Sequence, residues 1–251
     1  IALILYRKGN DVLILFDDTL FGDDFLFNRV QSNLILKILN KLPIRLTKLS
    51  NYNSTVISSS EVEHLSKLNS LHYAHGETNH AFRQSYEKIV KKQLTSAYMK
   101  INACFEDNNF NQIIIPGGIW GTSGIYTLFS KKYKTQLTSY DSDDSEMWMS
   151  IFGIAAQLGD IPYSFDRLIE NKEERNFAIQ KGNEQLKKRR EGRDKTQSHF
   201  LEATNTSEFG DDYYLMLLNS VWDTAALGLH TVYDSMIDWI LDSVEWVLTN
   251  T

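Results

Sequence analysis

The stretch "NQIIIPGGIWGTSG", residues 111–124, carries the clearest prediction of the fold. Its run of three isoleucines is uninterrupted by polar residues, which is typical of a strand that is buried on both faces of a parallel sheet. A glycine-rich loop follows Pro116, then a helical pattern over 123–135 and a second strand-like run over 136–141. This order of strand, helix and strand predicts a parallel pair joined by a crossover helix.

The pattern of short apolar runs and helical spacings continues on both sides of this stretch. Apolar residues at helical spacing, with Val30, Leu34 and Ile38 on one face, predict a helix over 25–42. We expect further strands at 1–6, 11–16, 44–49 and 213–218, and further helices at 80–109, 147–159, 173–195 and 232–248. The predicted class is therefore α/β, with a Rossmann-like parallel sheet flanked by helices.

Composition limits the possible functions of the 251-residue chain. Its net charge of -6 argues against a general nucleic-acid-binding protein, which would normally be basic. The single cysteine, Cys104, excludes an internal disulfide framework and fits a reducing compartment. Lys and Arg gather in residues 181–195, whereas residues 201–251 contain neither. A basic stretch of this kind is usually a solvated helix face, but it is also a candidate contact for phosphates or anionic lipid.

The loop after the 111–116 strand is the best candidate for a ligand site. Ligands of open α/β sheets bind at the carboxyl ends of the strands, and the N-terminus of the following helix favours an anion. The alternative is that the glycines only shape a tight turn. The candidate substrate-binding residues of this loop are Gly117, Gly118, Trp120, Gly121, Thr122 and Ser123.

A second candidate turn follows the expected strand at 213–218. It offers neutral hydrogen-bonding groups, a carboxylate and a flat indole, a set that suits a sugar or a nucleotide better than a metal. The alternative is a helix start in which Asp223 is the N-cap and Trp222 packs as a hydrophobic staple. The residues concerned are Asn219, Ser220, Trp222, Asp223 and Thr224.

Candidates for a general base come from three places. His75 and Glu77 lie in "LHYAHGETNHAFR" (71–83), and Asp17 and Asp141 each follow an expected strand. In the same stretch Arg83 is a candidate phosphate ligand.

Two other interpretations of these segments are weaker. A zinc site would use His72, His75, Glu77 and His80, but the helical pattern starts only near His80. A haloacid-dehalogenase-like phosphatase would need two aspartates separated by one residue, and Thr19 stands at the second position.

The segments 113–141, 153–162 and 218–248 resemble capsule and surface-polysaccharide biosynthesis proteins of the GT-B glycosyltransferase type. The motif "NSVWDTAALG" (219–228) is the most specific part of this resemblance, which covers roughly residues 80–251. It implies a bacterial, cytoplasmic enzyme with an acceptor-side domain over 1–195, a linker over 196–211 and the start of a donor-side domain over 212–251. The active site would lie between the two domains.

The resemblance also implies the partners and the reaction. The partners are a nucleotide-sugar donor and a glycan acceptor, without nucleic acid, and peripheral contact with the inner membrane or with polysaccharide assembly proteins is left open. No metal or other cofactor is expected. A complete donor-side domain needs on the order of a hundred further residues after Thr251, so whether residues 1–251 are active alone also stays open. The alternatives are a non-catalytic scaffold or export partner of an assembly complex and, less favoured, a phosphatase-like hydrolase.

Overall fold

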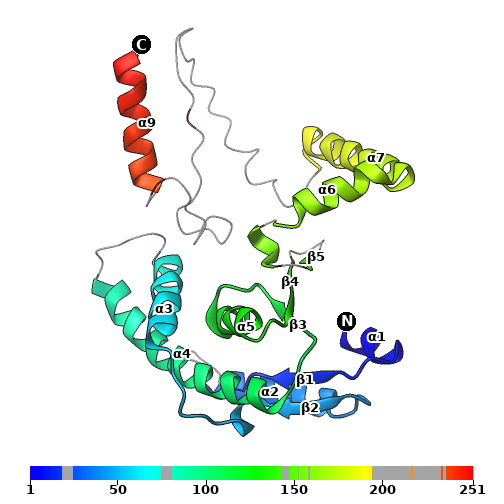
Figure 1. Cartoon of the computed structure of the whole chain (residues 1–251), viewed down its shortest axis with the longest axis vertical. Helices are drawn as coiled ribbons and strands as arrows, with labels where there is room; N and C mark the ends of the chain where they lie inside the picture. Colours follow the sequence, from blue (N-terminus) through cyan, green and yellow to red (C-terminus); the bar gives the residue numbers. More distant parts are fainter. Residues whose placement is uncertain are drawn as a thin grey trace. The chain divides into compact units, whose positions relative to one another are not determined.

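The structure is a computed structural model of the 251-residue chain, shown in Figure 1. It describes residues 1–18, 25–74, 81–142, 147–151, 153–157, 159–193 and 236–250, together with Met216 and Tyr233. The chain divides into two compact units, one with residues 1–113 and 119–136, the other with residues 114–118 and 137–251. The predicted linker at 196–211 and the predicted strand at 213–218 lie outside the described residues, apart from Met216.

The first unit contains a two-stranded parallel sheet. In its register Leu13 lies opposite Arg45 and Phe16 opposite Lys48, so the two strands end side by side. This confirms the strands expected at 11–16 and 44–49. The elements of this unit are α1 (Ala2–Arg7), β1 (Leu13–Phe16), α2 (Phe25–Leu39), β2 (Arg45–Lys48), the 3-10 turn η1 (Leu49–Asn51), α3 (Ser59–Tyr73), α4 (Ala81–Asp107) and α5 (Gly121–Lys132).

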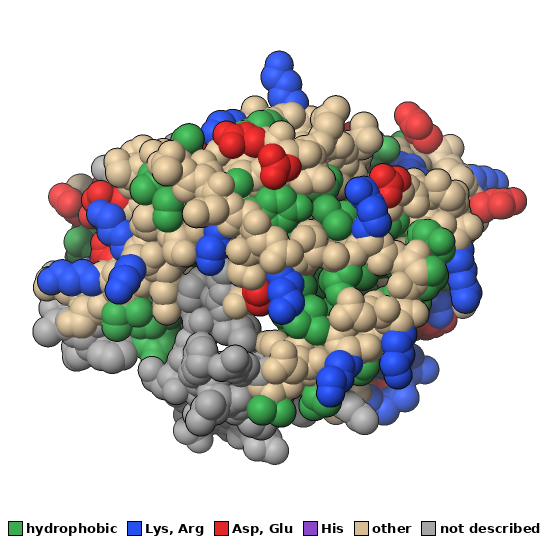
Figure 2. All heavy atoms as spheres, turned by 90° about the horizontal axis from the view of Figure 1, so that it is seen from below, with side chains coloured by type: hydrophobic (Ala, Val, Ile, Leu, Met, Phe, Trp, Pro, Cys, Tyr) green, Lys and Arg blue, Asp and Glu red, His purple; other side chains and the backbone are tan. Residues whose placement is uncertain are grey.

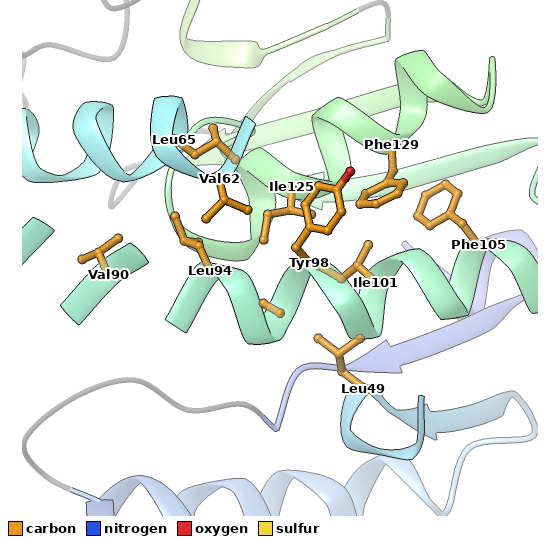
Figure 3. Packing of buried hydrophobic residues seen from close by; sticks show 11 residues of the cluster. Leu49, Val62, Leu65, Val90, Leu94, Tyr98, Ile101, Phe105, Ile125 and Phe129 are labelled. Atoms are coloured by element: carbon orange, nitrogen blue, oxygen red, sulfur yellow. The ribbon is translucent and has the colours of Figure 1, made fainter. Parts of the chain in front are cut away.

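The core of the first unit forms where α3 and α5 pack against α4. The long helix α4 presents apolar residues at intervals of three and four, which form one stripe along its length. Phe129 of α5 packs against this stripe, with its ring 4.9 Å from that of Tyr98 and 5.5 Å from that of Phe105. Figure 3 shows how the buried side chains meet; they are Leu49, Val62, Leu65, Val90, Leu94, Ala97, Tyr98, Ile101, Phe105, Ile125 and Phe129.

The second unit contains a three-stranded sheet in the order β3-β4-β5. The strands β3 and β4 are neighbours, and the chain between them forms α5, as the strand–helix–strand pattern predicts. The third strand, β5, runs antiparallel to β4, with Ser139 opposite Ser150. The elements are β3 (Gln112–Pro116), β4 (Gln136–Ser142), β5 (Met147–Ser150), the 3-10 turn η2 (Ala155–Gln157), α6 (Ile161–Glu170), α7 (Lys172–Arg190) and α9 (Met236–Asn250).

Two expectations about local structure are wrong. Residues 2–7 form the helix α1 rather than a strand. Residues 147–150 form the strand β5 rather than the start of a helix, because their backbone pairs with β4. The helix predicted over 25–42 is confirmed as α2, and its stripe of Val30, Leu34 and Ile38 is more than half exposed.

The class α/β is confirmed, with one parallel sheet and one that includes an antiparallel pair. The more specific Rossmann-like and GT-B assignments remain predictions. Exposed hydrophobic side chains lie among Lys and Arg side chains on the face drawn in Figure 2. Within the part of the chain that the structure describes, no helix is both long and apolar enough to cross a membrane.

Candidate functional site

A hydrogen bond joins the end of β1 to the start of α5. Thr122 donates from Oγ1 to Oδ2 of Asp17 over 2.7 Å, although the two residues are 105 positions apart in the chain. Asp17 directly follows β1, and Thr122 lies in the first turn of α5. The sequence predicted both residues as site residues in separate segments, and the fold of the first unit brings them together.

The carboxylate of the next residue, Asp18, makes different contacts. Asp18 accepts hydrogen bonds from the backbone N–H and the hydroxyl of Ser50, at 2.8 and 2.5 Å, in the turn η1 that follows β2. Successive side chains of an extended chain point to opposite sides, so Asp17 faces α5 while Asp18 ties together the ends of β1 and β2. This division favours a structural role for Asp18 and leaves Asp17 as the candidate for chemistry.

Helix α5 begins with a side-chain contact that the sequence did not predict. The first N–H groups of a helix lack partners within it, and here the N–H of Gly121 donates to Oδ1 of Asn69 on α3 over 2.8 Å. The N-cap residue, Trp120, makes no side-chain capping bond. Asn69 on α3 therefore satisfies the N–H of Gly121, while the Thr122 hydroxyl donates to Asp17.

An aromatic pair lies next to this contact along both helices. Trp120 and His72 stack with ring centroids 4.1 Å apart and ring planes 27° apart. His72 is three residues after Asn69 on α3, and Trp120 directly precedes Gly121. The sequence predicted His72 only as a possible zinc ligand. In the structure it stacks on Trp120, which is a predicted substrate-binding residue. We call Asp17, Asn69, His72, Trp120 and Thr122 the Asp17 site.

Tyr126 is a further residue near the Asp17 site. It follows Thr122 by four positions, which places both on the same side of α5. Burial raises the pKa of its phenol well above the usual value, and the negative charge of Asp17 raises that pKa further. Tyr126 is therefore a neutral group close to the carboxylate, and its i,i+4 spacing from Thr122 is a sequence signal that could have identified it.

The glycines of the predicted loop have different roles. Gly117, Gly118 and Gly121 have φ of 64°, 125° and 53°, in the region that favours glycine. The N–H of Gly117 donates to the carbonyl of Tyr140 over 2.9 Å within the second unit. These glycines therefore shape the turn that leads into α5, and Gly121 also contacts Asn69. Whether the loop also binds a ligand stays a prediction.

Of the remaining candidate residues, the structure describes Arg83 and Asp141. Arg83 is partly buried on α4. Asp141, on β4 in the second unit, accepts a hydrogen bond from the N–H of Ser142 over 2.9 Å. His75, Glu77 and the second predicted turn, with Asn219, Ser220, Trp222, Asp223 and Thr224, lie outside the described residues. The expected active site between the two domains thus stays a prediction.

The described residues give less support to a metal site or to a cysteine nucleophile. No group of three or more His, Cys, Asp or Glu side chains there is arranged to hold a metal ion. Burial raises the pKa of the Cys104 thiol to about 11, so this cysteine is a thiol at neutral pH and a poor nucleophile.

Comparisons with known proteins bring no match. No family model fits the chain, and no curated protein and no solved structure is significantly similar to it.

Proposed function

We propose that the protein is a glycosyltransferase that moves a sugar from a nucleotide-activated donor to a growing capsule or other surface polysaccharide. The observation that carries the proposal is the hydrogen bond between Asp17 and Thr122, which holds a carboxylate at the start of α5. Beside it, the stacked Trp120 and His72 offer aromatic surface of the kind on which a sugar or a base can lie. The resemblance to GT-B enzymes supports the same reaction.

Asp17 is the base that we assign in this reaction. As the acceptor hydroxyl oxygen attacks the anomeric carbon, the hydroxyl proton passes to the Asp17 carboxylate, and the nucleoside diphosphate leaves with the electrons of the broken bond. The sugar is transferred with inversion in this scheme. General-base catalysis of this kind contributes typically about 10²–10⁴-fold to a rate.

Thr122 acts through Asp17 and is a positioning residue. Its hydroxyl donates to one carboxylate oxygen and so restrains the orientation of the Asp17 carboxylate. The other candidate bases remain predictions. Asp141 accepts a hydrogen bond from the N–H of the next residue, and His75 and Glu77 lie outside the described residues.

A panel of nucleotide-sugars tests the proposal. We expect at least one of them to raise the melting temperature of the protein and to be hydrolysed slowly or transferred. Asp17→Asn should lower turnover by about 10²–10⁴-fold, while Thr122→Val should lower it less and Thr122→Ser should restore it. The matched control is Asp11→Asn, which removes an exposed carboxylate paired with Arg45 just before β1 and should leave turnover unchanged. If no nucleotide-sugar shifts the melting temperature or is consumed, the proposal is wrong.

A non-catalytic scaffold within a polysaccharide assembly complex is the second candidate. The observation that favours it is the exposed apolar stripe of Val30, Leu34 and Ile38 on α2, which is available for a protein contact. Unchanged polymer production by an Asp17→Asn strain, together with a loss of production on Leu34→Ser, would favour the scaffold over the enzyme.

A further inference from the structure

Helix α6 in the second unit has an apolar stripe that the protein leaves exposed. Ile161, Phe165 and Ile169 recur at intervals of four residues, which places them along one side of the helix. They are 57%, 62% and 53% exposed, and no residue of α6 is buried. A surface helix of a globular protein normally packs such a stripe against the core, so this stripe is available for another apolar environment.

Helix α7 follows α6 directly and is joined to it by an ion pair. Asn171 alone separates the two helices, and its side chain accepts hydrogen bonds from the N–H groups of Glu173 and Glu174. Arg167 of α6 donates two hydrogen bonds to Glu174 of α7, at 3.0 and 2.9 Å. Figure 1 shows α6 and α7 next to each other, and we call them the α6–α7 pair.

The far end of α7 is strongly basic. Its last turn consists of Lys187, Lys188, Arg189 and Arg190, all of them exposed. This concentration of positive charge contrasts with the net charge of -6 of the whole chain. The α6–α7 pair therefore combines an exposed apolar stripe with a cluster of four positive charges.

We propose that the α6–α7 pair binds to the surface of an anionic lipid bilayer. The stripe of α6 enters the boundary between headgroups and acyl chains, and the basic end of α7 contacts the lipid phosphates. Amphipathic helices with Lys and Arg residues lie on membranes in this way, by apolar burial and by attraction to anionic lipid. A nucleic acid would explain the charges but not the apolar stripe, whereas a bilayer surface matches both.

Each feature has its own expected effect on binding. Juxtamembrane Lys and Arg residues strengthen binding to anionic lipid by about fivefold each, so replacing all four by Gln should weaken it by at least about 100-fold. Raising the ionic strength from about 0.05 to 0.5 M should weaken the binding of the unaltered protein strongly, because the Debye length falls from more than about 10 Å to less than about 8 Å. Phe165→Ser with Ile169→Ser removes the apolar contribution and should weaken binding at both ionic strengths.

Cosedimentation with vesicles tests the proposal without any nucleotide-sugar, so its result is independent of the proposed glycosyl transfer. The vesicles contain phosphatidylcholine with or without phosphatidylglycerol, and circular dichroism checks that each variant is folded. The matched control is Leu34→Ser, which removes an equally exposed apolar side chain from α2. We expect binding only to the anionic vesicles, loss of binding with each of the two α6–α7 variants, and normal binding of Leu34→Ser.

Three results would overturn the proposal. The first is no cosedimentation of the unaltered protein with anionic vesicles. The second is equal loss of binding in Leu34→Ser, which would indicate non-specific adhesion. The third is a change of oligomeric state in Phe165→Ser with Ile169→Ser when the unaltered protein does not bind vesicles, which would assign the stripe to a contact between copies.

Discussion

Replacing Gly124 by alanine tests whether α5 packs as closely as the structure places it. Gly124 is buried inside α5, and a Cβ atom added there would lie 2.4 Å from the carbonyl oxygen of Ile119 and 2.9 Å from Cδ2 of Leu65. The Leu65 side chain can move, but the Ile119 oxygen belongs to the backbone that leads into α5. Relief of the clash therefore requires a shift of the helix or of the segment that carries Trp120.

The expected magnitude follows from two opposing effects. Overpacking of a well-packed interior costs about 1–3 kcal/mol, and a backbone clash places Gly124→Ala at the upper end of that range. The better helix propensity of alanine returns up to about 1 kcal/mol. We therefore expect a net loss of about 2 kcal/mol in the free energy of unfolding.

A glycine in another helix provides the matched control. Gly182 lies within α7, and a Cβ atom added there would meet nothing within 4 Å. Gly182→Ala should therefore stabilise its helix by about 0.5–1 kcal/mol. Urea denaturation followed by circular dichroism measures both variants. If Gly124→Ala is as harmless as Gly182→Ala, the close packing of α5 against the Ile119 carbonyl is incorrect.

Three further predictions concern the stability of the first unit. Phe129→Ala should lower the free energy of unfolding by about 3–5 kcal/mol because Phe129 is buried in the core. The control Phe177→Ala, at an exposed position of α7, should change the free energy of unfolding by less than about 0.5 kcal/mol, and equal effects of the two variants in denaturant titrations would contradict this. Burial raises the pKa of the Cys104 thiol to about 11 from an ordinary 9.0, so its contribution to stability is complete below pH 9.0 and is lost as the pH rises towards 11. Cys104→Ala should therefore flatten the alkaline part of a plot of stability against pH, and an unchanged alkaline part would count against the burial of the thiol. Two lysine side chains lower the pKa of Glu63, so its contribution to the free energy of unfolding is present above pH 4.5 and is lost as the pH falls below that value. Glu63→Gln should reduce the loss of stability at acid pH and low salt, and a variant that loses as much stability at acid pH as the unaltered protein would refute the pairing.

The secondary structure of long segments with apolar residues at helical spacing could be predicted from the sequence. That of short, wholly apolar segments could not. The helix α4 was predicted within two residues of its ends because its apolar stripe extends over several turns. The six residues "IALILY" contain no polar interruption, so they show neither the alternation of a half-buried strand nor the spacing of an amphipathic helix. Their composition therefore does not distinguish a strand from a helix. They form the helix α1, and none of its residues is buried. Only the backbone pairing of Met147–Ser150 with β4 decides that this apolar segment is a strand.

The Asp17 site was predicted in parts. Asp17 and Thr122 were both expected at the carboxyl end of a strand, but a sequence pattern does not say which strand ends share one compact unit. Asn69 was missed because an asparagine within a helix carries no signal for its partner, the N–H of Gly121. His72 was identified as a possible metal ligand, since a histidine side chain suits either a metal or an aromatic partner.

The most direct test of the account is the turnover of a nucleotide-sugar by Asp17→Asn, compared with the unaltered protein and with Asp11→Asn. Both variants lose one carboxylate near β1, but only Asp17 contacts Thr122. We expect kcat to fall by about 10²–10⁴-fold in Asp17→Asn, with little change in the KM for the donor, and to stay unchanged in Asp11→Asn. Equal kcat values for all three proteins would contradict the assignment of Asp17 as the base.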